Sequence, residues 1–326
     1  MTVPRTDVAE AAERWTSAEV KEWSPRWRET LAAWLETSLA LVGDEEWGAQ
    51  FRDMVRIGVD DPLAWANREI PLSNGHWAIA GIRFRGRDVE KPFVDIIATS
   101  LPPDPGGVAA LGEVLPNFRA FSPLCLRVNL PDAPQPFDVR AGSELGGGEA
   151  TSDQLIVARP VTDMLELPES PRYGAVTLAP CGAEDAAQRV ATIYRELALS
   201  RPKLDQWATP ADADSLEDTA REGLLFEIRV DDHPAGIIAA SREHAYGLRG
   251  FCMQEIAIDA AHRGRGIGVA ALQHLCRVLP AHADDVLWGH IHPDNVASLR
   301  NAEASGRLVI AAHTWITPAG YRGMPT

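Results

Sequence analysis

Apolar residues in the first 70 positions follow the spacing of amphipathic helices. They recur three and four positions apart between residues 27 and 39, and a second such stretch runs from 45 to 57. The pattern then changes to alternating apolar and polar residues over 76–84 and to a β-rich, mostly apolar run over 92–101. The chain therefore begins with helices and continues with strands.

The rest of the first half predicts a strand–helix–strand unit and a loop. The turn PPDPGG leads into a helix over 108–115 and a strand over 124–128, and a long irregular stretch with three consecutive glycines covers 131–152. A strand over 154–159 follows. The proline-containing segment LELPESPRYG at 165–174 indicates a linker between domains.

The second half has a regular order of elements. We expect a strand at 175–178, helices at 184–199 and 208–223 (the latter capped by Asp212 or Asp214), strands at 225–230, 235–241 and 251–258, a helix at 266–279, a strand at 286–291, a helix at 295–305, and two short strands ending near 321. This order predicts a mixed β-sheet flanked by helices over 166–326, preceded by a separate α/β domain over 1–165.

Charge and composition exclude several classes of protein. A net charge of −15 argues against nucleic-acid binding, which needs a basic face, and mildly favours a cationic substrate. The sequence lacks a long apolar run, and its start lacks the character of a signal peptide, so we expect a cytoplasmic protein without membrane contact. Four scattered cysteines indicate reduced, mostly buried thiols.

The sharpest chemical signal lies in QEIAIDAAHRGRGIGVAALQHLCRVL at 254–278. An apolar strand ends at Ile258, and closely spaced glycines then open a helix. Such glycines let backbone N–H groups approach an anion, and the positive end of the helix dipole favours negative charge. With Arg263 and Arg265 beside them, they form a candidate diphosphate site.

Two other interpretations of this loop stay open. Its glycines could serve turn geometry alone. Residues 266–271 also fit the dinucleotide pattern G-x-G-x-x-A, with acidic residues following at Asp284 and Asp285. Against a dinucleotide site, about five residues separate the strand from the first glycine, and only ~58 residues remain for the rest of the sheet.

The same segment resembles the GNAT superfamily of N-acyltransferases. RGRGIG at 263–268 matches the family's diphosphate loop Q/R-x-x-G-x-G/A, and EIAID takes the place of the family's fourth strand. Residues 295–306 look like its N-x-x-A/S element after the fifth strand. The resemblance is specific over roughly 249–306 and does not identify a subfamily.

The resemblance implies an acyl-CoA site and a direct transfer reaction. Acetyl-CoA would be the co-substrate and no metal would take part. The strand would contact the pantetheine arm and polarise the thioester carbonyl, and the loop would hold the diphosphate. The implied cofactor-binding residues are Ile256, Ala257, Ile258, Arg263, Gly264, Arg265, Gly266, Ile267, Gly268, Asn295 and Ser298. For Asn295, an ordinary helix N-cap is an equal alternative.

An amine that attacks a thioester must first lose a proton, so the site needs a base. Glu255, on the expected fourth strand, is the candidate catalytic residue, and a location near an apolar cleft would raise its pKa. The alternative is a glutamate that faces solvent. Glu243, His244 and Tyr246 in the preceding loop are secondary candidates.

The sequence departs from the family at the position of the usual acid. The family often has a tyrosine seven residues after the asparagine, where this chain has Ala302, and the element ends in Gly306-Arg307. Tyr321 or water would then protonate the leaving thiolate, or the thiolate would leave unassisted. Alternatively, the domain binds acyl-CoA as a sensor or interaction module with weak or no catalysis.

The remaining features leave the acceptor undefined. His290 and His292 share one face of a strand, so they could bind a metal with Asp294, line the acceptor site, or serve structure alone. The strand–helix–strand order of the first half suggests a degenerate second GNAT-like copy. It would build part of the acceptor site or a homodimer interface. We expect a primary amine of a small molecule or peptide as the acceptor.

Overall fold

The computed structural model describes residues 3–131, 148–201, 204 and 208–325. Its strands form one sheet of eleven in the order β1-β2-β3-β4-β11-β5-β10-β9-β8-β7-β6. The pairs β3–β4 and β9–β10 are parallel and the other neighbours are antiparallel. The predicted mixed α/β architecture is therefore confirmed.

The first half of the chain contributes helices, then strands. Its elements are α1 (Arg5–Arg14), α2 (Ala18–Trp23), α3 (Trp27–Leu39), α4 (Glu45–Val55), α5 (Pro62–Trp65), β1 (Arg68–Pro71), β2 (Trp77–Phe84), β3 (Pro92–Thr99), α6 (Pro105–Ala110), the 3₁₀ segment η3 (Leu111–Phe121), β4 (Leu126–Pro131) and β5 (Gly148–Pro160). Aspartates cap several of these helices: Asp44 accepts the N–H of Trp47, and Asp104 accepts that of Gly107.

The second half follows the predicted order closely. Its elements are α7 (Val161–Glu166), β6 (Val176–Pro180), α8 (Ala183–Ser200), α9 (Ala213–Arg221), β7 (Leu225–Val230), β8 (His233–Arg242), β9 (Gly250–Ile258), α10 (Ile267–Val278), β10 (Val286–Ile291), α11 (Val296–Ala304) and β11 (Leu308–Pro318). Asp212 caps α9, as one of the two expected residues.

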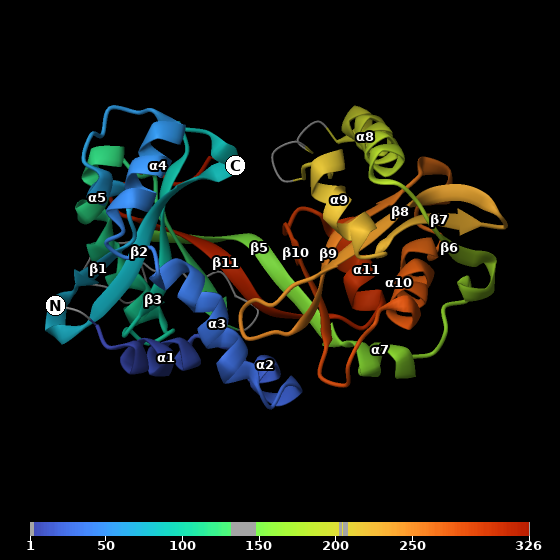
Figure 1. Cartoon of the computed structure of the whole chain (residues 1–326), viewed down its shortest axis with the longest axis horizontal. Coiled ribbons are helices and arrows are strands. Elements are labelled where there is room, and N and C mark those ends of the chain that lie inside the picture. The colour runs from blue at the N-terminus through green and yellow to red at the C-terminus, as the bar shows by residue number, and fades with distance from the viewer. Residues whose placement is uncertain (1–2, 132–147, 202–203, 205–207, 326) are drawn as a thin grey trace.

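The order of elements occurs twice, and the two halves exchange their last strands. In each half an antiparallel meander leads to a parallel pair joined by a helix: β3–α6–β4 in the first and β9–α10–β10 in the second. β5 then leaves the first half to pair with β10, and β11 leaves the second to pair with β4. In Figure 1 these two strands lie side by side across the centre of the molecule.

Helices cover both faces of the sheet. α1–α3 pack on the middle of the sheet. The core they form there includes Trp77 on β2 and Trp288 on β10. α6 and η3 cover the first half with residues such as Leu115 and Phe118. In the second half α10 packs on one face, and α8 and α9 pack on the other. The end of β9 therefore lies between α8 on one face of the sheet and α10 on the other.

Three expectations need correction or limitation. The two final short strands are one strand, β11, with register shifts at Val309/Ala311 and His313/Thr314 that break its apparent pattern. The predicted linker at 165–174 is not free, because Ser170 N–H and Pro168 C=O both bond the Gln273 side chain on α10. Of the irregular stretch 131–152, residues 132–147 lie outside the described residues and 148–152 belong to β5.

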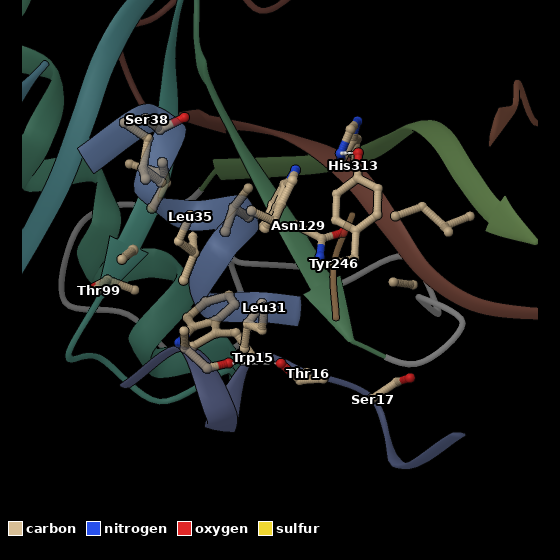
Figure 2. Close-up of a pocket in the computed structure, with 18 of the residues that line it drawn as sticks. Trp15, Thr16, Ser17, Leu31, Leu35, Ser38, Thr99, Asn129, Tyr246 and His313 are labelled. Atoms are coloured by element: carbon tan, nitrogen blue, oxygen red, sulfur yellow. Dashed lines mark hydrogen bonds between the residues drawn. The ribbon is translucent and has the colours of Figure 1, made fainter. Parts of the chain in front are cut away.

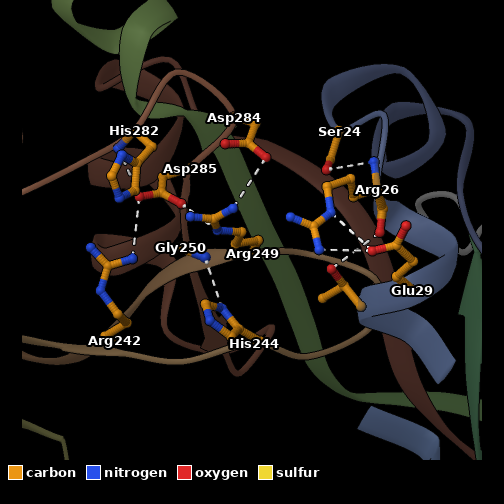
Figure 3. A network of polar contacts seen from close by, with 11 residues as sticks. Ser24, Arg26, Glu29, Arg242, His244, Arg249, Gly250, His282, Asp284 and Asp285 are labelled. Atoms are coloured by element: carbon orange, nitrogen blue, oxygen red, sulfur yellow. Dashed lines mark hydrogen bonds and ion pairs between the residues drawn. The ribbon is translucent and has the colours of Figure 1, made fainter. Parts of the chain in front are cut away.

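A buried ionic network secures the start of the β9–β10 pair (Figure 3). Asp285 is fully buried and forms two ion pairs. Its Oδ2 lies 3.3 Å from Nη1 of Arg242, and its Oδ1 lies 3.2 Å from Nε of Arg249. Asp284 lies 3.6 Å from Arg249. The two acidic residues that could have served a dinucleotide site are thus engaged by arginines of the sheet.

The four cysteines are free thiols that lie wholly or partly inside the protein. Cys125, Cys252 and Cys276 are buried, and Cys181 is half-buried; all four are free thiols. Burial raises the pKa of Cys125 to about 12 and that of Cys181 to about 11. Within the described residues, each helix is too short or too polar to span a bilayer.

Candidate functional site

The parallel strands β9 and β10 separate part-way along their length. They pair only at Gly250–Val286, Phe251–Leu287 and Cys252–Trp288. β9 then continues to Ile258 beside β8 alone, with a bulge at Gln254 where the register shifts. Because β10 no longer pairs with it, one edge of β9 is exposed to a gap inside the sheet.

A cavity of about 530 Å³ lies at this gap, between α8, the loop 262–266, and the first turns of α10 and α11. Ten of the eleven predicted cofactor-binding residues line it: Ile256, Ala257, Ile258, Arg263, Gly264, Gly266, Ile267, Gly268, Asn295 and Ser298. Arg265 is exposed and is not among the lining residues. Residues 40 positions apart in sequence are thus brought to one cavity.

The geometry of the loop explains its glycines. Gly264 (φ +69°) and Gly266 (φ +79°) adopt the left-handed conformation that side chains disfavour. Gly266 is the N-cap of α10, so the first N–H groups of that helix face the cavity. A Cβ on Gly268 would lie 2.6 Å from Oδ1 of Asn301, so this glycine lets α10 and α11 approach closely.

Arg263 lies at the glycine-loop end of the cavity with spare hydrogen-bonding capacity. Its Nε donates to the carbonyl oxygen of Ile258 at 2.7 Å, which fixes the side chain along the loop. Its buried Nη2 has no partner among the described residues. Burial lowers the pKa of Arg263. Arg201 and Arg300 line the same cavity, which gives this acidic protein a locally cationic rim.

The free edge of β9 offers backbone groups to the cavity. Asp259 donates its N–H to Ala235 on β8, and N–H directions alternate along a strand. The N–H groups of Ile256 and Ile258 therefore point toward the gap. That of Ile256 donates to Oε1 of Glu255 at 3.0 Å, so the carboxylate of Glu255 occupies it.

Glu255 is buried and lines a second, polar cavity of about 200 Å³ that adjoins the first. It does not face solvent, contrary to the alternative considered from sequence. Besides Ile256, it accepts the N–H of Ala211 at 3.3 Å and the hydroxyl of Tyr194 at 3.4 Å. Burial raises its pKa to about 6, although these hydrogen bonds oppose the rise. The expected pKa shift is present.

Tyr194 is a site residue that sequence reasoning missed. It lies on α8 and lines both cavities. Burial and the neighbouring Glu255 raise the pKa of its phenol, so it keeps its proton. Its signal in the sequence is weak, because a tyrosine within an amphipathic helix is usually a core residue.

Asn295 is a helix N-cap and also lines the cavities, so it has the positions that both of its considered roles require. The side chain of Asn295 accepts the N–H of Ser298 at 3.3 Å and so caps α11, while both residues line both cavities. Ala302, at the position of the usual tyrosine, is buried beneath Val157 and Ile291. Tyr321 packs against the core of the first half and lines neither cavity, so it is not placed to act as the acid.

The predicted histidine pair faces the polar cavity. His290 and His292 both line it, and the described residues contain no group of three or more potential metal ligands. The hydroxyl oxygen of Tyr246 lies 2.9 Å from Nε2 of His290 and 3.1 Å from Nε2 of His313. The protein packed around His290, together with Arg127, lowers its pKa even though the ring reaches solvent. His290 is therefore neutral near pH 7.

The secondary candidates lie away from Glu255. Glu243 and His244 are exposed and line neither cavity. His244 instead accepts the N–H of Gly250 through Nδ1, at the start of β9 (Figure 3). Tyr246 does not line the polar cavity, but its hydroxyl contacts His290, which does.

The first half has a smaller cavity of about 150 Å³ at the equivalent place (Figure 2). β3 and β4 pair only at Val94–Leu126 and Asp95–Arg127, and α1 and α3 cover the gap beyond. Figure 2 shows Tyr246 and His313 at one end, and Trp15 and Leu31 at the other. Here the Asp104 carboxylate caps α6 at the position of the diphosphate loop. Its charge would repel a diphosphate.

Comparison with known proteins gives one family match. The family model described as "Acetyltransferase (GNAT) family" matches residues 190–306. No curated protein matches the chain. The two cavities beside β9, the splayed strands and the loop all lie largely within the matched segment.

Solved structures of low sequence identity are also similar in part. A GCN5-related N-acetyltransferase from Kribbella flavida has 17% identity over 85% of this chain and 96% of its own, with a TM-score of 0.45. A tandem GNAT protein from the clavulanic acid biosynthesis pathway has 15% identity over 78% and 82%, with a TM-score of 0.43. A putative acetyltransferase of Salmonella typhimurium, solved with acetyl-CoA, has 16% identity over 44% and 94%, with a TM-score of 0.31.

Proposed function

We propose, from the premise that residues 190–306 form a domain of the GNAT acetyltransferase family, that this chain transfers an acetyl group from acetyl-CoA to a primary amine. The observation that carries the proposal is the cavity where β9 leaves β10, bounded by a glycine loop with an unsatisfied arginine. An elongated ligand with an anionic end fits such a cavity.

The residues present fit the co-substrate. The N–H groups at the start of α10 and Nη2 of Arg263 would receive the diphosphate, with Arg201 and Arg300 at the rim. The free edge of β9 would bond the pantetheine amides as an added strand does. Acetyl-CoA supplies the activated acyl group; the chain binds and orients it.

Glu255 is proposed as the base. As the amine nitrogen forms its bond to the acyl carbon and the carbon–sulfur bond breaks, a proton leaves the nitrogen for the Glu255 carboxylate, directly or through water. A carboxylate with a pKa of about 6 is ionised at neutral pH and yet basic enough to accept that proton. Glu255 must release the Ile256 N–H if that group is to polarise the carbonyl.

Tyr194 is proposed as the proton donor in place of Tyr321. It is protonated at neutral pH and lines both cavities at their junction. Its proton would pass to the leaving thiolate while its oxygen takes up the proton that Glu255, 3.4 Å away, has received from the amine. This assignment removes the main reason to regard the domain as a non-catalytic sensor, namely the alanine at position 302.

The first half is proposed to be a GNAT-like copy that no longer binds acyl-CoA. Domains bounded at 1–165 and 166–326 would then be joined by the exchanged strands β5 and β11. Its helices α1–α3 would support the sheet beneath the acceptor cavity.

Thiol release tests the function. Purified protein is mixed with acetyl-CoA and a panel of primary amines, and free thiol is measured with and without each amine. Amine-dependent release supports an N-acetyltransferase. Tight acetyl-CoA binding without release for any amine would instead favour the sensor interpretation.

A further inference from the structure

Arg307 is a buried cation at the polar cavity beside Glu255. It lies between α11 and β11, it is one of the residues that line the cavity, and it is only 4% exposed. Its backbone is fixed, because its N–H donates to Ala302 and the preceding carbonyl of Gly306 accepts Arg159 Nη1 at 2.9 Å. These contacts hold the backbone of Arg307 at the cavity wall.

Among the described residues, the side chain of Arg307 has no ion-pair partner and no hydrogen-bond acceptor. Its Nε is buried and unsatisfied. Arg127, by contrast, forms a two-point pair with Asp95. Burial lowers the pKa of Arg307 to about 10, and the groups that oppose this are the thiols of Cys276 and Cys252 rather than a carboxylate.

An unpaired buried guanidinium is costly unless an anion reaches it. The acyl donor does not supply that anion, because the diphosphate loop borders the larger cavity and Arg307 does not line it. The polar cavity is the space from which an anion could reach Arg307. Glu255 lines the same small cavity, so a carboxylate suited to an amine and a guanidinium suited to an anion belong to residues that border one space.

We propose that the acceptor is a small amino acid, whose carboxylate is held by Arg307 while its amino group faces Glu255. This inference rests on the proposed acetyltransferase function and specifies its substrate class. The planar guanidinium matches a carboxylate with two parallel hydrogen bonds. The polar cavity of about 200 Å³ suits a compact acceptor.

The test compares amines that differ only in the carboxylate. Glycine and L-alanine are assayed against glycinamide and L-alaninamide with acetyl-CoA, and rates are expressed per deprotonated amine. A charge-assisted pair contributes about 10-fold to 100-fold in kcat/KM. We expect the wild-type protein to prefer the acids by that factor and Arg307→Met to lose the preference while keeping its activity on the amides. Equal rates for acid and amide would overturn the proposal.

Two controls separate this inference from the proposed function. Arg195→Met removes an exposed arginine on α8 and is expected to keep the preference. Calorimetric binding of acetyl-CoA to Arg307→Met should match wild type, which shows that the variant is folded; failure of wild type to bind would count against the function itself. Binding of N-acetylglycine, measured without turnover, should weaken about 10-fold or more in Arg307→Met. Unchanged binding would again overturn the role of Arg307.

Discussion

Cys252 on β9 faces Trp288 on β10 as the last pair of their parallel ladder. Beyond this pair β9 runs on for six residues along β8 alone. The exposed edge, the bulge at Gln254 and the buried Glu255 all follow within three positions of Cys252. The separation of two strands thus creates the cleft and places the candidate base at its mouth.

Replacement of Glu255 by glutamine is expected to lower kcat by about 100-fold or more, because a general base typically contributes 10²–10⁴. In wild type, kcat/KM should rise with pH through about 6, where Glu255 ionises. The variant should lack this rise and keep its acetyl-CoA affinity. Glu217→Gln, on an exposed face of α9, is the matched control. A pH profile that is the same in Glu255→Gln as in wild type would remove Glu255 as the base.

The same group predicts a pH-dependent stability. The pKa of Glu255 is raised in the folded state, so its contribution to stability is fully present below its ordinary pKa of 4.5 and is lost as pH rises through about 6. Glu255→Gln avoids that loss. The free energy of unfolding of the variant, relative to that of wild type, should therefore be about 2 kcal/mol larger at pH 8 than at pH 4. Denaturant unfolding at both values measures it, and a constant difference would mean that the pKa is not raised.

Tyr194→Phe is expected to slow turnover by about 10-fold to 100-fold with little change in acetyl-CoA affinity, because it deletes the proposed proton donor and leaves the ring. The loss should be smallest with acyl donors whose leaving thiol is most acidic, since those thiolates need no proton. Kinetics with thioesters of different thiols test this. An equal loss for all thioesters would point to a structural role for the hydroxyl.

Gly266→Val tests the loop. The change forces a β-branched residue into a left-handed conformation, which costs about 1–2 kcal/mol or more, and it adds a side chain at the N-cap of α10, beside the cavity. Acetyl-CoA binding should weaken at least about 10-fold while the protein stays folded. Gly58→Val is the control, because Gly58 has no atoms near its would-be Cβ and a negative φ. Retained affinity in Gly266→Val would show that the loop is only a turn.

Asp285→Asn tests the network that secures the strand pair. The substitution leaves Arg242 and Arg249 without their buried carboxylate, so we expect a loss of about 3–5 kcal/mol in the free energy of unfolding. Asp284→Asn, which loses only a longer contact to Arg249, should cost under about 1 kcal/mol. Urea titration of both variants decides, and equal losses would contradict the central role of Asp285.

The sequence was informative where local chemistry determines structure. The glycine spacing at 264–268 and the apolar strand before it placed the loop and one side of the larger cavity. Asp212 and Asn295 stand where helix caps are needed, and both are caps. These features depend on neighbours a few residues away, which a sequence displays directly.

Features that depend on distant pairing could not be predicted. The exchange of β5 and β11 is decided by contacts between residues such as Val157 and Gly289, more than 100 positions apart. Tyr194 and Arg307 gain their importance only when α8 and β11 come together at β9. A buried arginine and a core tyrosine have no distinct local signature, so only the fold reveals that they share a cavity with Glu255.

Calorimetric titration of the wild-type protein with acetyl-CoA, and separately with NAD, tests the central claim most directly. The account predicts micromolar binding of acetyl-CoA, which corresponds to about −8 kcal/mol, and no binding of NAD. Binding of NAD alone, or of neither compound, would contradict the assignment of the cleft between β9 and β10 as an acyl-CoA site.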